Sequence, residues 1–305
     1  MLKNTVKTSV LLAGLGGLIV TVAGVLGGGS TGALLIGLVL AIAMVGGSYW
    51  FSDRLALRSA KATVIGPDDH PLLYQTVANL AQQAGMPMPT VAISPDLQPN
   101  AFATGRGPNH AVVCATEGLL AELPPDELAA VMAHELMHVK HRDILIGSVA
   151  AAIATAISFV ANMAMWATAF GGGDDDDSPN PLALLATALL APIAASLMQM
   201  AISRSREFDA DRGAAELLGS GEPLARALRR IEAMAARRPM EVAPAQAHAY
   251  IHNPLAEFNR PGGRGLNLAR LFSTHPSTDA RIERLLAAAD ALSPPAGPHR
   301  STAPF

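Results

Sequence analysis

The sequence has few charged residues, few aromatic side chains and a single cysteine. Only 15% of its 305 residues are charged and 4% are aromatic, whereas 50% are hydrophobic. Soluble domains usually carry about 25% charged residues, so the deficit predicts membrane-spanning segments. Cys114 cannot form an internal disulfide, and we expect it to fill a buried strand position in a reducing compartment. The net charge of −3, without a basic block, argues against nucleic acid as a partner.

Two uncharged stretches near the N-terminus are each close to the roughly 20 residues that span a bilayer. The first covers residues 8–27 and the second covers residues 33–51, with a short Gly/Ser loop between them. A cleaved signal peptide is the alternative for the first stretch. The apolar region of a signal peptide is only about 7–15 residues long, and a second span does not usually follow at once. The first stretch is longer than that and is followed directly by the second. We therefore expect residues 1–52 to form a retained two-helix transmembrane anchor.

Two further uncharged stretches lie in the middle of the chain, at residues 144–170 and 181–202. The loop between them contains four consecutive aspartates, but it lacks the alternating spacing and final glutamate of a calcium loop, so we expect it to be solvated. A pair of buried Ala-rich helices in a soluble core is the alternative for the two stretches. The length of the first uncharged stretch favours a transmembrane hairpin at residues 144–202.

The basic residues that flank the four predicted spans all lie on one side of the membrane. Under the positive-inside rule that side is the cytoplasm, so both termini and most of the polar chain are expected there. The other side receives only the Gly/Ser loop and the aspartate loop. The flanking basic residues are Lys3, Lys7, Arg54, Arg58, Lys61, Lys140, Arg142, Arg204 and Arg206.

Outside the spans, residues 53–292 are typical of a mixed α+β domain that the hairpin interrupts. Short β-type runs at residues 90–94 and 111–115 predict a small sheet. The proline-rich residues 293–305 are expected to be a disordered tail. Helices are expected at residues 71–84, 117–122, 203–218, 224–237 and 279–292.

A His-Glu-x-x-His motif runs from His134 to His138, after two prolines and two acidic residues that suit the first turn of a helix. Two histidines four residues apart on a helix project from one face, so both rings can bind a single tetrahedral Zn²⁺. Glu135 then lies where it can take a proton from a metal-bound water. The helix is expected to continue through Asp143 toward the third span.

A zinc site of this kind needs a third protein ligand. One extended motif places a glycine three residues and a histidine six residues after the second histidine, but His141 and Ile144 occupy those positions. If the hairpin is antiparallel, Glu207 and His138 lie at similar heights, roughly 7–9 Å above the membrane boundary. Asp211, one turn later, faces the same way and can orient a ligand histidine. The alternative for both acids is a solvated helix face.

Four motifs together resemble those of a known protease family. They are residues 100–105 (NAFATG), 134–143 (HELMHVKHRD), 203–211 (SRSREFDAD) and 272–276 (FSTHP). With them the chain resembles the HtpX heat-shock membrane metalloproteases and, more distantly, the integral-membrane CAAX prenyl proteases. The resemblance implies a bacterial inner-membrane endopeptidase with one zinc ion per subunit. It also implies stress quality control, with membrane proteins or unfolded polypeptides as substrates.

The resemblance assigns a role to each residue of the metal site. It implies zinc ligation by His134, His138 and Glu207, with Glu135 as the catalytic base. It implies that Asp211 orients a ligand from the second shell of the metal.

The resemblance also implies residues that contact the substrate. Asn100 precedes an expected edge strand, beside which an extended substrate would add through backbone hydrogen bonds; a simple turn residue is the alternative for Asn100. His275 is expected to donate to the oxyanion of a tetrahedral intermediate, and a helix-entry residue before Pro276 is the alternative. The expected edge strand comprises Ala101, Phe102, Ala103 and Thr104.

The sequence thus predicts a mainly α integral membrane protein with four transmembrane helices. A cytoplasmic zincin-like metalloprotease domain of mixed α+β structure, with a small sheet, completes the predicted fold. The predicted function is zinc-dependent cleavage of misfolded or damaged membrane proteins. A CAAX-type prenyl-protein-processing protease is one alternative, although it usually has more spans, and a non-catalytic membrane scaffold is another, although every expected catalytic position is filled. The sequence does not define the oligomeric state.

Two other classes of membrane protein are disfavoured. An intramembrane-cleaving protease would place the His-Glu-x-x-His motif inside an apolar span, but residues 140–142 carry charge between the motif and the third span. A metal transporter would need ionisable residues within the spans, and the four uncharged stretches contain none.

Overall fold

The structure is a computed structural model of the chain. It describes residues 28–144, 204–235, 237, 250–251 and 276–292, together with parts of the helical stretch 9–24. The predicted hairpin beyond residue 144, the residue His275 and the predicted tail at residues 293–305 lie outside the described residues.

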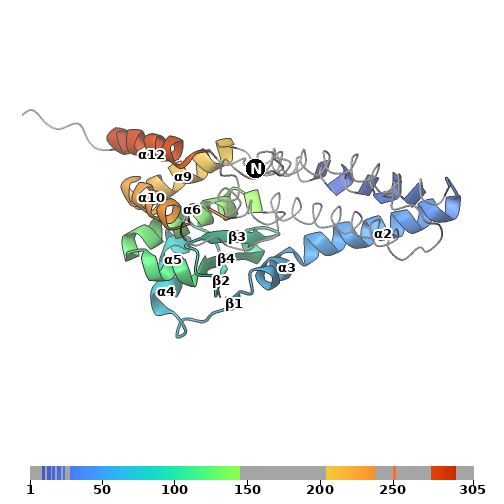
Figure 1. Cartoon of the computed structure of the whole chain (residues 1–305), viewed down its shortest axis with the longest axis horizontal. Coiled ribbons are helices and arrows are strands. Elements are labelled where there is room, and N and C mark those ends of the chain that lie inside the picture. The colour runs from blue at the N-terminus through green and yellow to red at the C-terminus, as the bar shows by residue number, and fades with distance from the viewer. Residues whose placement is uncertain are drawn as a thin grey trace, which may run out of the picture.

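A four-stranded sheet lies at the centre of the folded domain (Figure 1). The parallel neighbours β2 (Thr90–Ser94) and β4 (Ala111–Thr116) confirm the two predicted strands. Two strands pair antiparallel with them, namely β1 (Thr63–Val64) with β2 and β3 (Ala101–Gly105) with β4. The resulting order is β1-β2-β4-β3. β3 is therefore the outermost strand on one side of this sheet, although its residues are all buried.

The helices begin where the sequence offers capping groups. In α4 (Pro71–Gln83) a proline occupies the first turn, and the ring of His70 accepts a hydrogen bond from a backbone N–H three residues later (3.2 Å). In α5 (Glu117–Glu122) the hydroxyl of Thr116 does the same (3.1 Å). The remaining helices of the domain agree with the predicted ones to within two residues and are α9 (Arg204–Leu218), α10 (Glu222–Ala235) and α12 (Thr278–Leu292).

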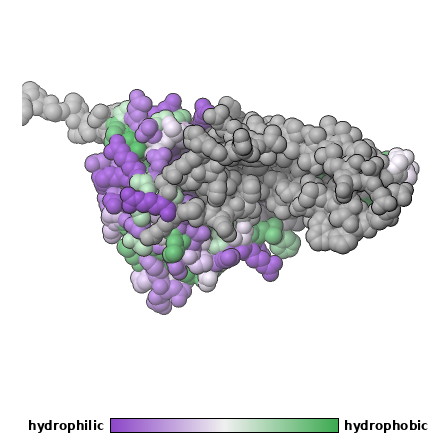
Figure 2. All heavy atoms as spheres, viewed as in Figure 1, coloured by the Kyte–Doolittle hydropathy of each residue, from purple (hydrophilic) through white to green (hydrophobic). Residues whose placement is uncertain are grey.

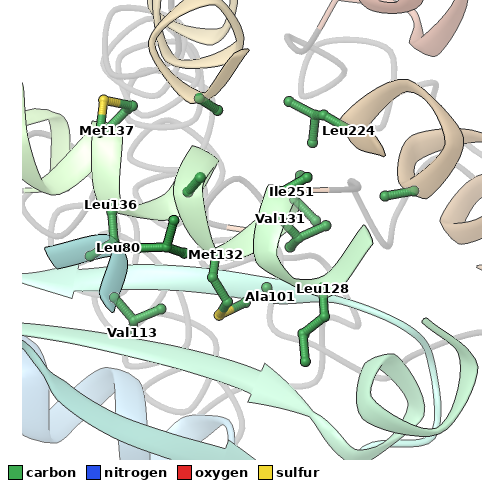
Figure 3. Packing of buried hydrophobic residues seen from close by; sticks show 14 of the residues in the cluster. Leu80, Ala101, Val113, Leu128, Val131, Met132, Leu136, Met137, Leu224 and Ile251 are labelled. Carbon is green, nitrogen blue, oxygen red and sulfur yellow. The ribbon is translucent and has the colours of Figure 1, made fainter. Parts of the chain in front are cut away.

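The helix α6 (Pro125–Lys140) is the central element of the core. It packs against β3 and β4 on one side and against α9 and α10 on another. Leu128 and Met132 point toward the strands, whereas Met137 points to the opposite side (Figure 3). Full burial of each such side chain stabilises the fold by about 1.5–3 kcal/mol. A helix that is buried on both sides holds its polar residues in a fixed place inside the protein.

The opposite face of the sheet is covered by the short helix α3 (Ser52–Ser59) and by Tyr250. Phe102 and Cys114 lie in this second hydrophobic cluster, and residues of α3 pack against it. The rings of Phe102 and Tyr250 meet edge to face, with centroids 5.1 Å apart. Cys114 is completely buried in β4, so the prediction that it fills a strand position is confirmed.

The helix α2 (Thr31–Trp50) extends away from the domain (Figure 1). The visible face of the domain is mainly hydrophilic (Figure 2), whereas α2 exposes large apolar side chains. Taken singly, none of the described helices combines the length and apolar character needed to cross a membrane, but Thr31–Gly47 and Ser52–Ser59, bent by 71°, meet this requirement as a pair. The predicted number of four spans stays a prediction. The most exposed apolar residues of α2 are Ile36, Val39, Ile42, Trp50 and Leu35.

Candidate metal and active site

The two histidines of the His-Glu-x-x-His motif lie side by side on α6. His134 is fully buried and His138 is partly exposed, and their rings meet edge to face with centroids 4.7 Å apart. The Nε2 atoms of the two rings are 3.1 Å apart. The four-residue spacing thus places two ring nitrogens on one side of the helix, as the sequence predicts.

Glu207 reaches the two histidines from α9. Its Oε1 atom is 3.4 Å from Nε2 of His138, and its Oε2 atom is 3.8 Å from Nε2 of His134. Small residues let α9 approach α6 closely, because a Cβ atom on Gly213 would lie only 2.8 Å from the side chain of Met137. The structure therefore brings together three residues that the sequence places 4 and 69 positions apart (138 minus 134, and 207 minus 138).

These three side chains fit a tetrahedral metal ion. Ligand atoms bound about 2.0–2.1 Å from a tetrahedral zinc lie roughly 3.3 Å from one another. The two Nε2 atoms are 3.1 Å apart, and the two oxygens of Glu207 lie 3.4 Å from Nε2 of His138 and 3.8 Å from Nε2 of His134, all close to that value. Two imidazole nitrogens and one carboxylate oxygen are also a donor set that zinc enzymes use, with the fourth position left for water. The three side chains could therefore hold a metal ion.

Each of the two histidines has a carboxylate at its other ring nitrogen. Nδ1 of His134 lies 2.9 Å from Oδ1 of Asp211. Nδ1 of His138 lies 3.4 Å from Oδ2 of Asp143. Contacts of this kind hold a metal-binding ring in one orientation and one tautomer. Asp211 is one of the residues that the sequence analysis singled out, whereas Asp143 was not assigned a role there.

The sequence led us to expect that the helix α6 continues through Asp143. In the structure the helix breaks before Asp143, and this break lets Asp143 reach His138. The helix ends at Lys140, and His141 is its C-cap. Arg142 then adopts a left-handed conformation with φ 61°. This break changes the direction of the chain, and helical structure resumes only at Asp143.

Arg281 is the second residue of the site that the sequence analysis missed. It comes from α12, is only 2% exposed, and donates to both carboxylate oxygens of Asp211 at 2.6 and 2.9 Å. Its Nη1 atom lies 3.6 Å from Oε2 of Glu207, and its Nη2 atom lies 3.4 Å from the ring of His134. Only a weak pattern in the sequence could have indicated Arg281: it lies on a helix that begins a few residues after the His-Pro motif. A bidentate Arg–carboxylate pair has a fixed geometry, so Arg281 holds Asp211 in place.

The charges of the pocket set the protonation of its residues. Burial raises the pKa of Glu135 to about 7. Burial and the charge of Arg281 lower the pKa of His134 to about 4, despite the hydrogen bond with Asp211. Burial disfavours the cationic form of His138, but Glu207, the hydrogen bond with Asp143 and the charge of Glu135 together outweigh it and raise the pKa of His138 to about 9. The carboxylates therefore favour positive charge near His138, which is the charge that a metal ion would bring.

Burial alone would raise the pKa of Asp211, but the charge and hydrogen bonds of Arg281 outweigh it and lower the pKa. This carboxylate therefore stays ionised beside His134. An ionised acceptor at Nδ1 keeps the proton on that nitrogen and leaves Nε2 free to bind a metal.

The strand to which a substrate is expected to add, β3, lies beside this group of residues. The helix α6, which carries Glu135, packs directly against β3, and Glu135 is only 2% exposed. Asn100 is fully buried before β3, where its Oδ1 accepts from the N–H of Ala101 (3.1 Å) and its own N–H donates to Thr116 (2.9 Å). Its predicted role toward a substrate stays a prediction. His275 lies outside the described residues, so its predicted place near the site stays a prediction.

Known proteins resemble this chain over most of its length. The model for peptidase family M48 matches residues 67–289. A protease HtpX homolog of Syntrophotalea carbinolica is 50% identical over 287 residues, covering 92% of this chain and 98% of that protein. A protease HtpX homolog of Burkholderia ambifaria is 48% identical over 287 residues, covering 93% of this chain and 96% of the relative.

A solved structure, the crystal structure of S. mikatae Ste24p, matches with a TM-score of 0.49 and 19% identity, covering 93% of this chain and 65% of the other. A likeness at this level adds no evidence about function. The family match and the curated relatives are much stronger findings, and they identify a metallopeptidase of the HtpX type. Together with a buried cluster of two histidines and a glutamate that fits a metal ion, they show that this chain belongs to peptidase family M48.

Proposed function

We propose that this chain is a zinc-dependent endopeptidase that cleaves misfolded or damaged membrane proteins from the cytoplasmic side of the bacterial inner membrane. The observation that carries the proposal is the buried cluster of His134, His138 and Glu207 with Glu135 beside it. The exposed apolar side chains of α2 support a membrane location. The relatives are proteases, which supports polypeptides as the substrates.

The residues of the cluster have distinct roles in this proposal. The side chains of His134, His138 and Glu207 hold the metal. When bound, zinc supplies an activated water molecule and polarises the carbonyl group of the scissile bond. Asp211 and Asp143 fix the orientation of the two rings from the far side, through the contacts at 2.9 and 3.4 Å.

Glu135 transfers a proton from the attacking water to the leaving amine in this proposal. Its pKa of about 7 lies near the working pH, so the carboxylate can accept the proton of the attacking water and later give it to the leaving amine. The helix α6 packs against β3, so this carboxylate lies near the strand beside which a substrate would add. His275 is proposed to donate to the oxyanion of the intermediate.

The test compares zinc content and proteolysis in purified wild-type protein and two variants. Glu135→Gln keeps the shape of the side chain but removes its basicity, so we expect zinc content near that of the wild type and at least a hundredfold loss of casein cleavage. Glu207→Ala removes a ligand, so we expect loss of both zinc and cleavage. Glu117→Gln, on an exposed position of α5, is the matched control for an ordinary Glu-to-Gln change.

Each result has a clear meaning. Undiminished cleavage by the Glu135→Gln variant would reject the base. Full zinc retention by the Glu207→Ala variant would reject the third ligand. Cleavage by wild-type protein that persists after chelation, in detergent, would reject a metal-dependent mechanism. The cytoplasmic orientation is tested separately, by protease accessibility of the domain in inverted membrane vesicles.

A further inference from the structure

The helix α3 lies at the junction between α2 and the folded domain (Figure 1). The segments Thr31–Gly47 and Ser52–Ser59 meet there at a bend of 71°. The helix α2 contains no charged residue, whereas three of the eight residues of α3 are charged. Charged side chains are costly in the hydrocarbon of a bilayer, so the bend separates a helix that can enter the bilayer from one that cannot. If α2 runs along the membrane normal, α3 lies 19° from the membrane plane (90 minus 71).

One side of α3 is fixed to the domain. Ala56, Leu57 and Ala60 pack against the hydrophobic cluster on the sheet that contains Phe102. The backbone carbonyl of Ala60 also accepts a hydrogen bond from the hydroxyl of Ser94 in β2 (2.7 Å). These contacts determine which side of the helix faces the sheet and which side faces outward.

The outward side of α3 combines apolar and basic side chains. Phe51, just before the helix, and Leu55 are 45% and 52% exposed, and Arg54 and Arg58 are exposed as well. These four residues follow one another at spacings of three, one and three positions, so they share one face of the helix. The acidic residue of α3, Asp53, lies on the opposite side by the same spacing, and its carboxylate accepts from the N–H of Arg54 (2.8 Å). The outward face therefore carries net positive charge beside exposed apolar groups.

A further arginine connects the domain to the end of α2. Arg106, which directly follows β3, donates from Nη1 to the backbone carbonyl of Trp50 (3.2 Å). Its guanidinium group lies over the indole ring, 4.5 Å from the ring centroid, yet Trp50 is 59% exposed. Tryptophan rings are enriched at membrane–water interfaces, and guanidinium groups bind phosphate through charge-assisted hydrogen bonds. The junction thus presents aromatic rings and guanidinium groups side by side.

We propose that the outward face of α3, together with Trp50 and Arg106, lies in the membrane interface and binds the phosphate groups of anionic phospholipids. A bilayer surface offers acyl chains for the apolar side chains and negative phosphates for the arginines at nearly the same depth. This inference rests on the membrane location in the proposed function. Because α3 also packs against β3, the sheet is held about one helix diameter, roughly 10 Å, from the headgroups. The interface helix thereby sets the height of the sheet above the bilayer.

The test is photo-cross-linking of the full-length protein in liposomes with equal amounts of phosphatidylglycerol and phosphatidylcholine. The photoreactive residue p-benzoyl-phenylalanine replaces Leu55, and mass spectrometry measures how much of each lipid becomes attached. Val39 in α2 and the exposed Glu232 on α10, at the other end of the domain (Figure 1), are the reference positions. We expect lipid adducts at Leu55 and Val39 but not at Glu232. At Leu55 we expect phosphatidylglycerol to exceed phosphatidylcholine at least about fivefold, the effect of one basic residue near an anionic lipid surface.

Two double variants test the charges. Arg54→Gln with Arg58→Gln removes both outward cations of α3, so we expect the adducts at Leu55 to persist but the excess of phosphatidylglycerol to fall below about twofold. The matched control, Arg229→Gln with Arg237→Gln, removes two exposed arginines in and just after α10. This control should keep the excess of the otherwise wild-type protein.

Each failure has a different meaning. Adducts at Val39 without adducts at Leu55 would overturn the interfacial position of α3 and leave the membrane location intact. Equal attachment of the two lipids at Leu55 would overturn the binding of anionic headgroups, and an unchanged excess in the Arg54→Gln, Arg58→Gln variant would reject the role of these arginines. The absence of lipid adducts at both Leu55 and Val39 would instead reject the membrane location in the proposed function, and this proposal with it.

Discussion

Replacing Arg281 by glutamine is the most informative perturbation of the metal site. The guanidinium binds both oxygens of Asp211 at 2.6 and 2.9 Å and lies 3.6 Å from Glu207. Arg281 and Asp211 are each only 2% exposed. Glutamine is too short to reproduce the fork and carries no charge, so the Asp211 carboxylate would keep only the ring of His134 as its close partner among the described contacts.

The expected magnitude follows from the burial of this pair. Removing one partner of a buried ion pair leaves an uncompensated charge and lowers the free energy of unfolding by about 3–5 kcal/mol. Loss of a residue that holds a ligand's hydrogen-bond partner weakens metal binding by roughly 10- to 100-fold. The charge of Arg281 also lowers the pKa of His134, so its removal raises that pKa. Protons then compete better with the metal, and the loss of zinc affinity should grow as the pH falls.

The assay separates metal binding from general stability. Zinc affinity is measured by competition with a chromophoric chelator, and thermal stability is measured with the metal removed. Arg230→Gln is the matched control, because Arg230 binds Glu127 of the same helix α6 through two nitrogens at 2.8 and 3.2 Å. Glu127 lies seven positions before His134 (134 minus 127), outside the metal site. We expect the control variant to lose stability but to keep zinc affinity within about twofold of the wild type.

A single result would refute this reasoning. If Arg281→Gln binds zinc within about twofold of the wild type at both acid and neutral pH, while its stability falls as in the control, Arg281 only stabilises the fold. In that case the contacts to Asp211 and Glu207 have no effect on the metal ligands.

Three further predictions concern separate features. Asp143→Asn should weaken zinc binding about tenfold with little change in thermal stability, and unaltered affinity in the same competition assay would contradict a role in orienting His138. Gly118→Ala should destabilise the domain severely, because the new Cβ would lie 2.2 Å from a backbone oxygen, whereas Gly46→Ala has open space; equal melting temperatures for the two variants would reject this explanation. Burial raises the pKa of Cys114 to about 12, so iodoacetamide should label it only after denaturation, and rapid labelling of native protein at mildly alkaline pH would argue against the buried position.

The local features of the site could be predicted because they depend on short-range geometry. Helix periodicity places His134 and His138 on one side of α6, and a proline with two acidic residues marks the start of that helix. The two β-type runs became β2 and β4 for a similar reason, since alternation and β-branched residues favour strands. The partnership with Glu207 followed from matching heights on two helices, and the structure brings that residue to the same pocket.

β3 was less visible from the residues alone. The segment Ala101–Gly105 has one aromatic residue and no β-branched residue except Thr104, and all of its positions are buried. Its conformation is stabilised by pairing with β4 on one side and with Tyr250 on the other. Such contacts depend on chain segments far away in the sequence, which no local pattern reports.

The sequence by itself therefore determined the helix that carries the two histidines and the third residue of the group that could hold a metal ion. Only the tertiary structure decided what orients these groups. Arg281 lies 147 positions beyond His134 (281 minus 134), Asp143 reaches His138 after a left-handed residue at the end of α6, and the N–H of Ile251 donates to the carbonyl of Ala101 in β3. Side-chain type sets what a residue can bind, but the packing of distant segments sets which groups actually meet, because burial energy is gained from contacts of the whole core.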